Sequence, residues 1–76
     1  MEIYKFMSKL TNELNENLFY EVELCKEYNS LDKTFLLDIR CKLYKKNYRY
    51  SISIHENLLN DKSINEIINS LLISNF

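Results

Sequence analysis

The sequence predicts one α+β domain over residues 1–76, in the order α-β-β-β-α, with a three-stranded antiparallel meander and two helices packed on one face of it. Three observations predict this fold. Apolar residues recur at helical spacing near both ends of the chain, apolar and polar residues alternate in its middle, and short polar segments separate these stretches. A domain of this size buries only about 60–65% of the surface of its unfolded chain, so we expect modest stability.

The first predicted helix covers residues 2–15. Its apolar residues form one helical stripe, made of Ile3, Phe6, Met7, Leu10 and Leu14. The chain contains no glycine, so asparagine is expected wherever the backbone needs a positive φ angle. Asn15 and Asn17 are therefore the residues expected to end this helix.

The first predicted strand covers residues 18–27, where apolar and polar residues alternate. The face that packs on the helices is expected to hold Leu18, Tyr20, Val22 and Leu24. The opposite face is expected to hold Phe19, Glu21, Glu23 and Cys25. Residues 28–32 are rich in turn-forming side chains and predict a connecting loop.

Residues 33–44 and 48–55 predict the second and third strands, joined as a hairpin through Lys45-Lys46-Asn47. The inward side chains are expected to be Phe35, Leu37, Ile39, Cys41, Leu43, Tyr48, Tyr50, Ile52 and Ile54. The outward side chains are expected to be Leu36, Asp38, Arg40, Lys42, Tyr44, Arg49, Ser51, Ser53 and His55. Asn47 is the expected residue of positive φ. A two-residue turn between Tyr44 and Asn47 would set Lys42 opposite Arg49, a like-charged pair that is unfavourable unless an anionic partner offsets it.

The last predicted helix covers residues 61–74. Its apolar stripe consists of Ile64, Ile67, Ile68, Leu71 and Leu72, and its expected cap is Asp61 or Ser63, because residues 63–66 match a capping box. Ile73 and Phe76 fall off this stripe and are expected to cover the end of the sheet or to join a dimer contact.

Charge is distributed unevenly along the chain. Residues 33–50 carry six bases and one acid, whereas the segments before and after them are net acidic, and the whole chain has a net charge of −1. A basic segment between acidic ones indicates partner binding. The bases and the neighbouring tyrosine expected to contact a partner are Arg40, Lys42, Tyr44, Lys45, Lys46 and Arg49. A solvated hairpin end, kept soluble by its lysines, is the simpler alternative.

Three carboxylates share the open face of the predicted sheet: Glu21, Glu23 and Asp38. They are expected either to mimic the phosphates of a nucleic acid and occupy a basic cleft, or to form ordinary surface ion pairs, such as one between Glu21 and Arg40. Both groups of residues belong to the same predicted partner-binding surface.

No enzyme, metal site or cofactor is expected. His55 is the only histidine, and the parity of the strands sets it on the opposite face from Cys41. Cys25 shares the face of His55 but no third orienting group accompanies them, and one histidine with two cysteines on opposite faces does not make a zinc site or a disulfide. No apolar run reaches the length of a membrane span, so a reduced cytoplasmic setting is expected.

The α-β-β-β-α order resembles the double-stranded RNA-binding domain. That family opens its second helix with a lysine cluster and carries glycine and proline in the loop between its first two strands. Here residues 61–66 contain one lysine, Lys62, and residues 28–32 contain neither glycine nor proline, so the RNA-binding activity of the family is not expected.

The chain is also similar to the anti-CRISPR proteins, small inhibitors of Cas nucleases that phages encode. The similarity covers size, element order, charge distribution and the absence of a catalytic site, and it rests on no motif. It implies a non-enzymatic phage or mobile-element protein that acts in a bacterial cytoplasm by docking on a nuclease or its guide complex. In this reading the bases of the hairpin are expected to contact guide RNA or an acidic protein surface. The alternatives are a small nucleic-acid-binding module that uses the basic segment of residues 40–50, or a dimeric structural protein.

Overall fold

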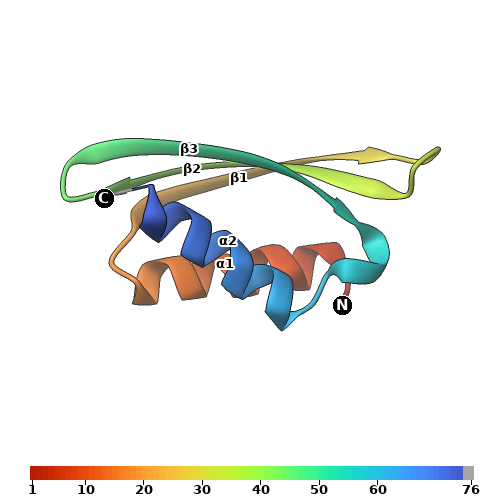
Figure 1. Ribbon diagram of the computed structural model, residues 1–76, viewed down its shortest axis with the longest axis horizontal. Coiled ribbons are helices and arrows are strands. Elements are labelled where there is room, and N and C mark those ends of the chain that lie inside the picture. The colour runs from red at the N-terminus through yellow and green to blue at the C-terminus, as the bar shows by residue number, and fades with distance from the viewer. Residues whose placement is uncertain (75–76) are drawn as a thin grey trace.

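The computed structural model describes residues 1–74 and has the predicted α-β-β-β-α order. Its helices are α1 (Ile3–Glu16) and α2 (Asp61–Ile73), and a short 3-10 helix, η1 (Glu56–Leu58), precedes α2. The strands β1 (Tyr20–Asn29), β2 (Thr34–Leu43) and β3 (Lys46–His55) form one antiparallel sheet in the order β1-β2-β3. Both helices lie on the same face of this sheet and leave the other face open (Figure 1).

The core lies between the helices and the sheet and follows the predicted apolar stripes. Phe6, Leu10 and Leu14 of α1 are fully buried, and Ile64, Ile67 and Leu71 of α2 face the same core. From the sheet, Leu37 and Ile39 of the central strand are also fully buried. The predicted inward faces of β2 and β3 are therefore confirmed, although Tyr48, Tyr50 and Ile52 on the outer strand are only half-buried.

The end of α1 corrects the prediction for the first strand. The helix ends at Glu16, and Leu18 takes the left-handed backbone with a φ of 71°. The Phe19 N–H donates to the Leu14 carbonyl at 3.0 Å, and the Leu18 N–H donates to the Asn15 carbonyl at 3.1 Å, which is the Schellman arrangement. As a result Phe19 is buried and Leu18 is 64% exposed, the reverse of the predicted faces.

A bulge in β1 shifts the register of its first residues against β2. The pairing with β2 is irregular between Tyr20 and Glu23, and Glu21 has a φ of 50°. Tyr20 consequently pairs with Lys42 on the open face rather than facing the helices as predicted. After the bulge, Val22 and Leu24 pack against the core and Cys25 is exposed, so the predicted parity holds there.

The β2–β3 turn differs by one residue from the predicted one. Its two central residues are Tyr44 and Lys45, with φ angles of 50° and 66°, so Asn47 is not the residue of positive φ. Positive φ at both central residues is typical of the type I′ turn, whose twist matches that of the strands. Leu43 pairs with Lys46, and this register sets Arg40 opposite Arg49 and Lys42 opposite Asn47.

The start of α2 also differs from the prediction. Asn60 caps the helix, because its side-chain oxygen accepts the Ser63 N–H at 3.0 Å. The Ser63 hydroxyl donates to the Leu58 carbonyl instead of capping, so neither Asp61 nor Ser63 has the predicted role. Ile73 is 71% exposed and does not cover the sheet, and Phe76 lies outside the described residues.

Replacement of Phe6 by alanine tests the core. Because Phe6 is fully buried between α1 and the sheet, the change should lower the free energy of unfolding by about 3–5 kcal/mol, measured by urea denaturation. Leu31→Ala is the control, since Leu31 is 92% exposed, and it should change stability by less than about 0.5 kcal/mol. Equal effects of the two changes would contradict the assigned core.

The turn is tested by glycine substitutions at neighbouring lysines. Lys45→Gly should raise the free energy of unfolding by about 1 kcal/mol, because it removes the steric cost of a side chain at positive φ. Lys46→Gly is the matched control. Lys46 lies in β3, so glycine there should lower stability by roughly 0.5–1 kcal/mol. The same sign for both changes would contradict a turn centred on Tyr44 and Lys45.

Candidate functional site

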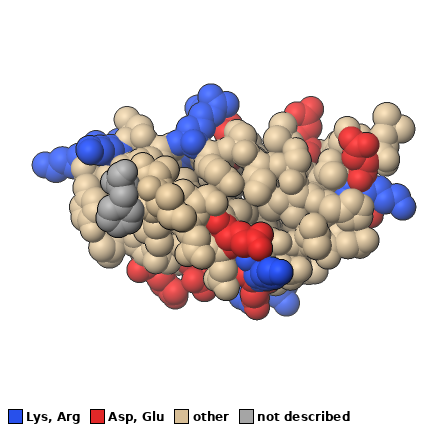
Figure 2. Space-filling model, viewed as in Figure 1, with Lys and Arg blue, Asp and Glu red and all other residues tan. Residues whose placement is uncertain are grey.

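The candidate site is the end of the sheet that carries the β2–β3 turn. Lys and Arg side chains gather at this end of the molecule in Figure 2, which has the same view as Figure 1. On the open face next to the turn, an open hollow of about 440 Å³ lies over the three strands. Its lining residues are Glu21, Glu23, Arg40, Cys41, Lys42, Asn47, Tyr48 and Arg49.

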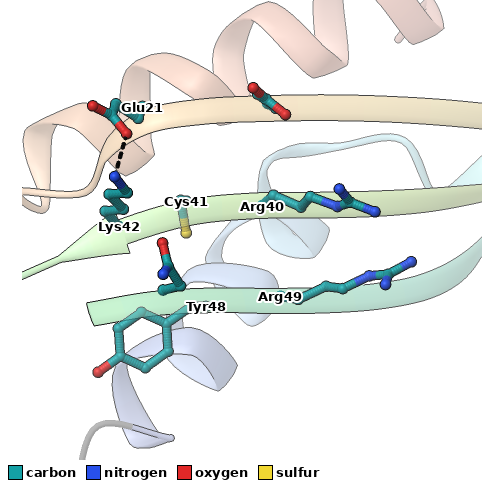
Figure 3. Close-up of a pocket in the computed structure, with 8 residues that line it drawn as sticks. Glu21, Arg40, Cys41, Lys42, Tyr48 and Arg49 are labelled. Atoms are coloured by element: carbon teal, nitrogen blue, oxygen red, sulfur yellow. Dashed lines mark ion pairs between the residues drawn. The ribbon is translucent and has the colours of Figure 1, made fainter. Parts of the chain in front are cut away.

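Figure 3 shows how the charged side chains of this hollow are arranged. The Glu21 carboxylate on β1 binds the Lys42 ammonium on β2, with 2.8 Å between Oε2 and Nζ. This ion pair and its hydrogen bond raise the pKa of Lys42. The bulge in β1 brings Glu21 to this position, so the pair that the sequence predicted between Glu21 and Arg40 does not form.

Arg40 and Arg49 lie opposite each other on β2 and β3 and extend in the same direction (Figure 3). Two like charges in this position repel each other, and a neighbouring carboxylate, that of Asp38, offsets the repulsion. Arg49 donates from Nε to Oδ1 of Asp38 at 3.0 Å and from Nη2 to Oδ2 at 3.1 Å. Arg40 is held more loosely, with 3.8 Å between its Nε and Oδ2 of Asp38.

Asp38 is the best-bound carboxylate on the open face. The Ser51 hydroxyl also donates to its Oδ1 at 3.0 Å, and its side chain is only 23% exposed. Hydrogen bonds from Arg49 and Ser51 hold the pKa of Asp38 below its ordinary value, and the bound carboxylate in turn raises the pKa of Arg49. The alternating pattern predicted that Ser51 points outward. Its hydrogen bond to Asp38 depends on the register of β2 against β3, which the pattern does not determine.

The turn itself carries two lysines that have no carboxylate partner on the open face as the structure describes it. Among the described residues, no ion pair reaches the side chains of Lys45 or Lys46. Tyr44 is 74% exposed beside them. The Lys45 N–H donates to the Tyr20 hydroxyl at 3.2 Å, so β1 braces the turn. This role of Tyr20 could not be predicted from the sequence, because the apolar pattern does not show the bulge that turns its side chain to the open face.

The predicted partner-binding residues therefore fall into two groups. The hollow brings together Glu21, Glu23, Arg40, Lys42 and Arg49, with Asp38 in the adjacent row. Tyr44, Lys45 and Lys46 form a separate tip at the turn, which we call the basic tip. Glu21 and Asp38 are bound within the chain, which makes them poor mimics of phosphate, whereas the basic tip is available to a partner.

His55 and the cysteines lie apart from one another. His55 accepts the Asn57 N–H at its Nδ1, at 3.1 Å, and so caps η1. Cys41 is buried, and burial raises the pKa of its thiol. Cys25 is exposed at the other end of the row that contains Asp38 and Ser51. No ion pair or hydrogen bond within the described residues joins these three side chains.

The lowered pKa of Asp38 predicts a pH dependence of stability. A carboxyl group with a folded-state pKa below its unfolded value of about 3.9 stabilises the fold above that pH, and this stabilisation is lost as the pH falls through the folded-state pKa. Asp38→Asn should therefore unfold at lower urea concentration than the parent at pH 7, and the difference between the two midpoints should shrink as the pH falls through the folded-state pKa of Asp38.

The control for this experiment is Asp32→Asn, which changes an exposed carboxylate in the other turn of the sheet. It should shift the midpoint little at either pH. If the urea midpoints of Asp38→Asn and the parent differ by the same amount at every pH, the assigned role of the Asp38 carboxylate is wrong.

Comparison of this chain with known protein families, with curated proteins and with solved structures finds no match. In residues 1–74, no helix has the length and apolar character that crossing a membrane requires. The same residues contain no cluster of three or more side chains that would hold a metal ion. The most distinctive feature of the surface is the basic tip, which joins two lysines to an exposed tyrosine.

Proposed function

We propose that this protein acts by binding, as a non-enzymatic phage or mobile-element inhibitor of a bacterial defence nuclease or ribonucleoprotein, in the manner of the anti-CRISPR proteins. The observation that carries the proposal is the contrast between the basic tip and the rest of the open face. Lys42 and Arg49 have carboxylate partners within 3.0 Å, whereas Lys45 and Lys46 have no such partner in the described residues. Cationic side chains that are held out together suit an anionic surface on another molecule.

The backbone of the basic tip supports the same proposal. Tyr44 and Lys45 adopt positive φ, which costs roughly 1–2 kcal/mol per residue for side chains other than glycine or asparagine. The sheet positions Tyr44 with its ring largely in solvent, where it makes no compensating contact with the core. The turn therefore holds the Tyr44 ring where a partner can reach it.

The role of the hollow in this proposal is to set the direction of the bases. Arg40 has only the 3.8 Å contact with Asp38, so most of its donors remain available beside the basic tip. Glu21 and Asp38 fix Lys42 and Arg49 in place, and Glu23 adds an acceptor for the partner. Preorganised side chains lose less entropy on binding, and charge complementarity raises the association rate and the specificity.

A second candidate function is a small nucleic-acid-binding module. The exposed ring of Tyr44 between lysines favours it, because bases stack on exposed aromatic rings while lysines contact phosphates. The two candidates differ in one measurement. A nucleic-acid-binding module should bind short RNA or DNA with an affinity that falls steeply with salt, and an inhibitor of a protein complex should bind naked nucleic acid weakly at all salt concentrations.

The proposed inhibition is tested with the tagged protein in lysates of bacteria that express Cas nuclease complexes, followed by DNA cleavage assays with each captured complex. Cleavage should fall until about one protein is bound per complex. The variant Lys45→Glu/Lys46→Glu should fold normally and bind at least about tenfold more weakly, because it reverses the charge of the basic tip.

The matched control is Lys5→Glu/Lys62→Glu, which makes the same change in net charge on two exposed helix residues away from the sheet. It should inhibit as the parent does. Unchanged inhibition by the Lys45→Glu/Lys46→Glu variant would overturn the assignment of the basic tip. Steep, salt-dependent binding to RNA or DNA without inhibition of any complex would favour the second candidate.

A further inference from the structure

The two edges of the sheet differ in how they are protected. An exposed edge strand can pair with another chain, and proteins block this with bulges or with charged side chains that point inward. β1 has both devices. Its bulge lies between Tyr20 and Glu23, and Lys26 has the parity of the apolar face and sets its ammonium 5.1 Å from the centre of the Tyr4 ring.

The edge formed by β3 has no bulge, and its one charged side chain with the parity of the apolar face is Lys46, at the end next to the turn. It runs for ten residues from Lys46 to His55 in regular register with β2, without a bulge. Residues 50–54 contain no charge and no proline. Because Leu43 and Lys46 close a two-residue turn, they form a hydrogen-bonded pair, and the backbone groups of every second residue from Asn47 onward point away from β2. β3 lies at the margin of the sheet, with β2 as its only neighbouring strand in the described residues (Figure 1).

We infer that β3 pairs with β3 of a second copy of this chain, antiparallel and about a two-fold axis at Ser51, to form a continuous six-stranded sheet. The contact extends from Asn47 to His55 and adjoins the basic tip at Lys46. In this register Asn47, Arg49 and Ser51 meet residues of the second copy whose backbone groups also point outward, so the new ladder is hydrogen-bonded throughout. A two-fold axis makes the contact self-complementary, and the assembly closes as a dimer.

The side chains favour this register over its neighbours. On the apolar face, Tyr50 lies beside Ile52 of the second copy and Tyr48 beside Ile54, and pairs of aromatic and β-branched residues stabilise sheets. On the open face, Arg49 lies beside Ser53 of the second copy, so no like charges meet across the new ladder. A shift of the axis to Arg49 would instead set two arginines opposite each other, which is unfavourable.

The inward side chains of β3 leave exposed surface that a second copy could cover. Tyr48, Tyr50 and Ile52 are only half-buried, while their partners across the sheet, Ile39 and Leu37, are fully buried. A second copy would cover the exposed sides of the β3 residues. Small domains commonly gain stability in this way, because one short chain cannot bury a large core.

The dimer is tested by the concentration dependence of mass in sedimentation equilibrium, with the whole chain. We expect a monomer–dimer equilibrium with a dissociation constant on the order of 10 µM, since a single strand edge makes a small interface. In the dimer the amides of Asn47, Ser51 and Ser53 should exchange with solvent at least about tenfold more slowly than in the monomer. A strict monomer up to about 1 mM would overturn the inference.

Ser53→Pro provides a sharper test of the edge. The Ser53 N–H points away from β2, so proline removes an intermolecular donor without removing a hydrogen bond of the existing sheet. This variant should weaken the dimer at least about tenfold, and its circular dichroism should match that of the parent. Ser53→Ala is the control and should dimerise normally. Equal dimerisation of a folded Ser53→Pro variant would overturn the inference.

The register is tested by opposite charges at position 53, which do not depend on the proline variant. Ser53→Lys should weaken the dimer several-fold, roughly threefold to tenfold, because the new ammonium then meets Arg49 of the second copy at two places. Ser53→Glu should dimerise at least as tightly as the parent, because it sets a carboxylate beside the same arginine. Equal effects of the two changes would overturn the proposed register.

Discussion

The register of β2 against β3 is the constraint on which the other features of this protein depend. It sets Leu37 and Ile39 under the helices, and it also sets Arg40 opposite Arg49 and Asp38 opposite Ser51 on the open face. The repulsion between the two arginines is offset by Asp38, which Arg49 binds through two hydrogen bonds. One arrangement of strands therefore determines both the apolar core and the pattern of ion pairs on the opposite side.

The absence of glycine shapes the turns of the fold. Five of the described residues have positive φ, and none of them is asparagine: Leu18, Glu21, Lys33, Tyr44 and Lys45. Each conformation is imposed by the elements on either side. Leu18 completes the Schellman end of α1, and Tyr44 and Lys45 close a hairpin whose strands are fixed by their apolar parity. Tertiary packing outweighs a local steric preference of about 1–2 kcal/mol at these positions.

The open face and the edges of the sheet divide the surface into regions with different chemistry. In the centre of the open face, carboxylates and bases largely neutralise one another, so this region is a weak candidate for attracting a charged partner. Within residues 1–74 the lysines of the basic tip have no ion pair, and β3 is an edge strand with one neighbouring strand. A partner bound at the tip and a second copy bound along β3 would occupy adjacent surfaces, which would allow a dimer to present two tips.

The element order, the helical stripes and the inward and outward faces of β2 and β3 follow from the sequence, because apolar periodicity reports burial directly. Periodicity did not predict two local features, the exchange of Leu18 and Phe19 and the cap at Asn60, because short-range hydrogen bonds set them. The bulge that frees Glu21 for Lys42 and the turn at Tyr44 and Lys45 belong to the tertiary structure. For the turn, a register two residues away preserves the same parity, so the alternating pattern cannot distinguish the two. Only the joint fit of the helices, the bulge and the hairpin selects the register, and with it the partners of each charged side chain.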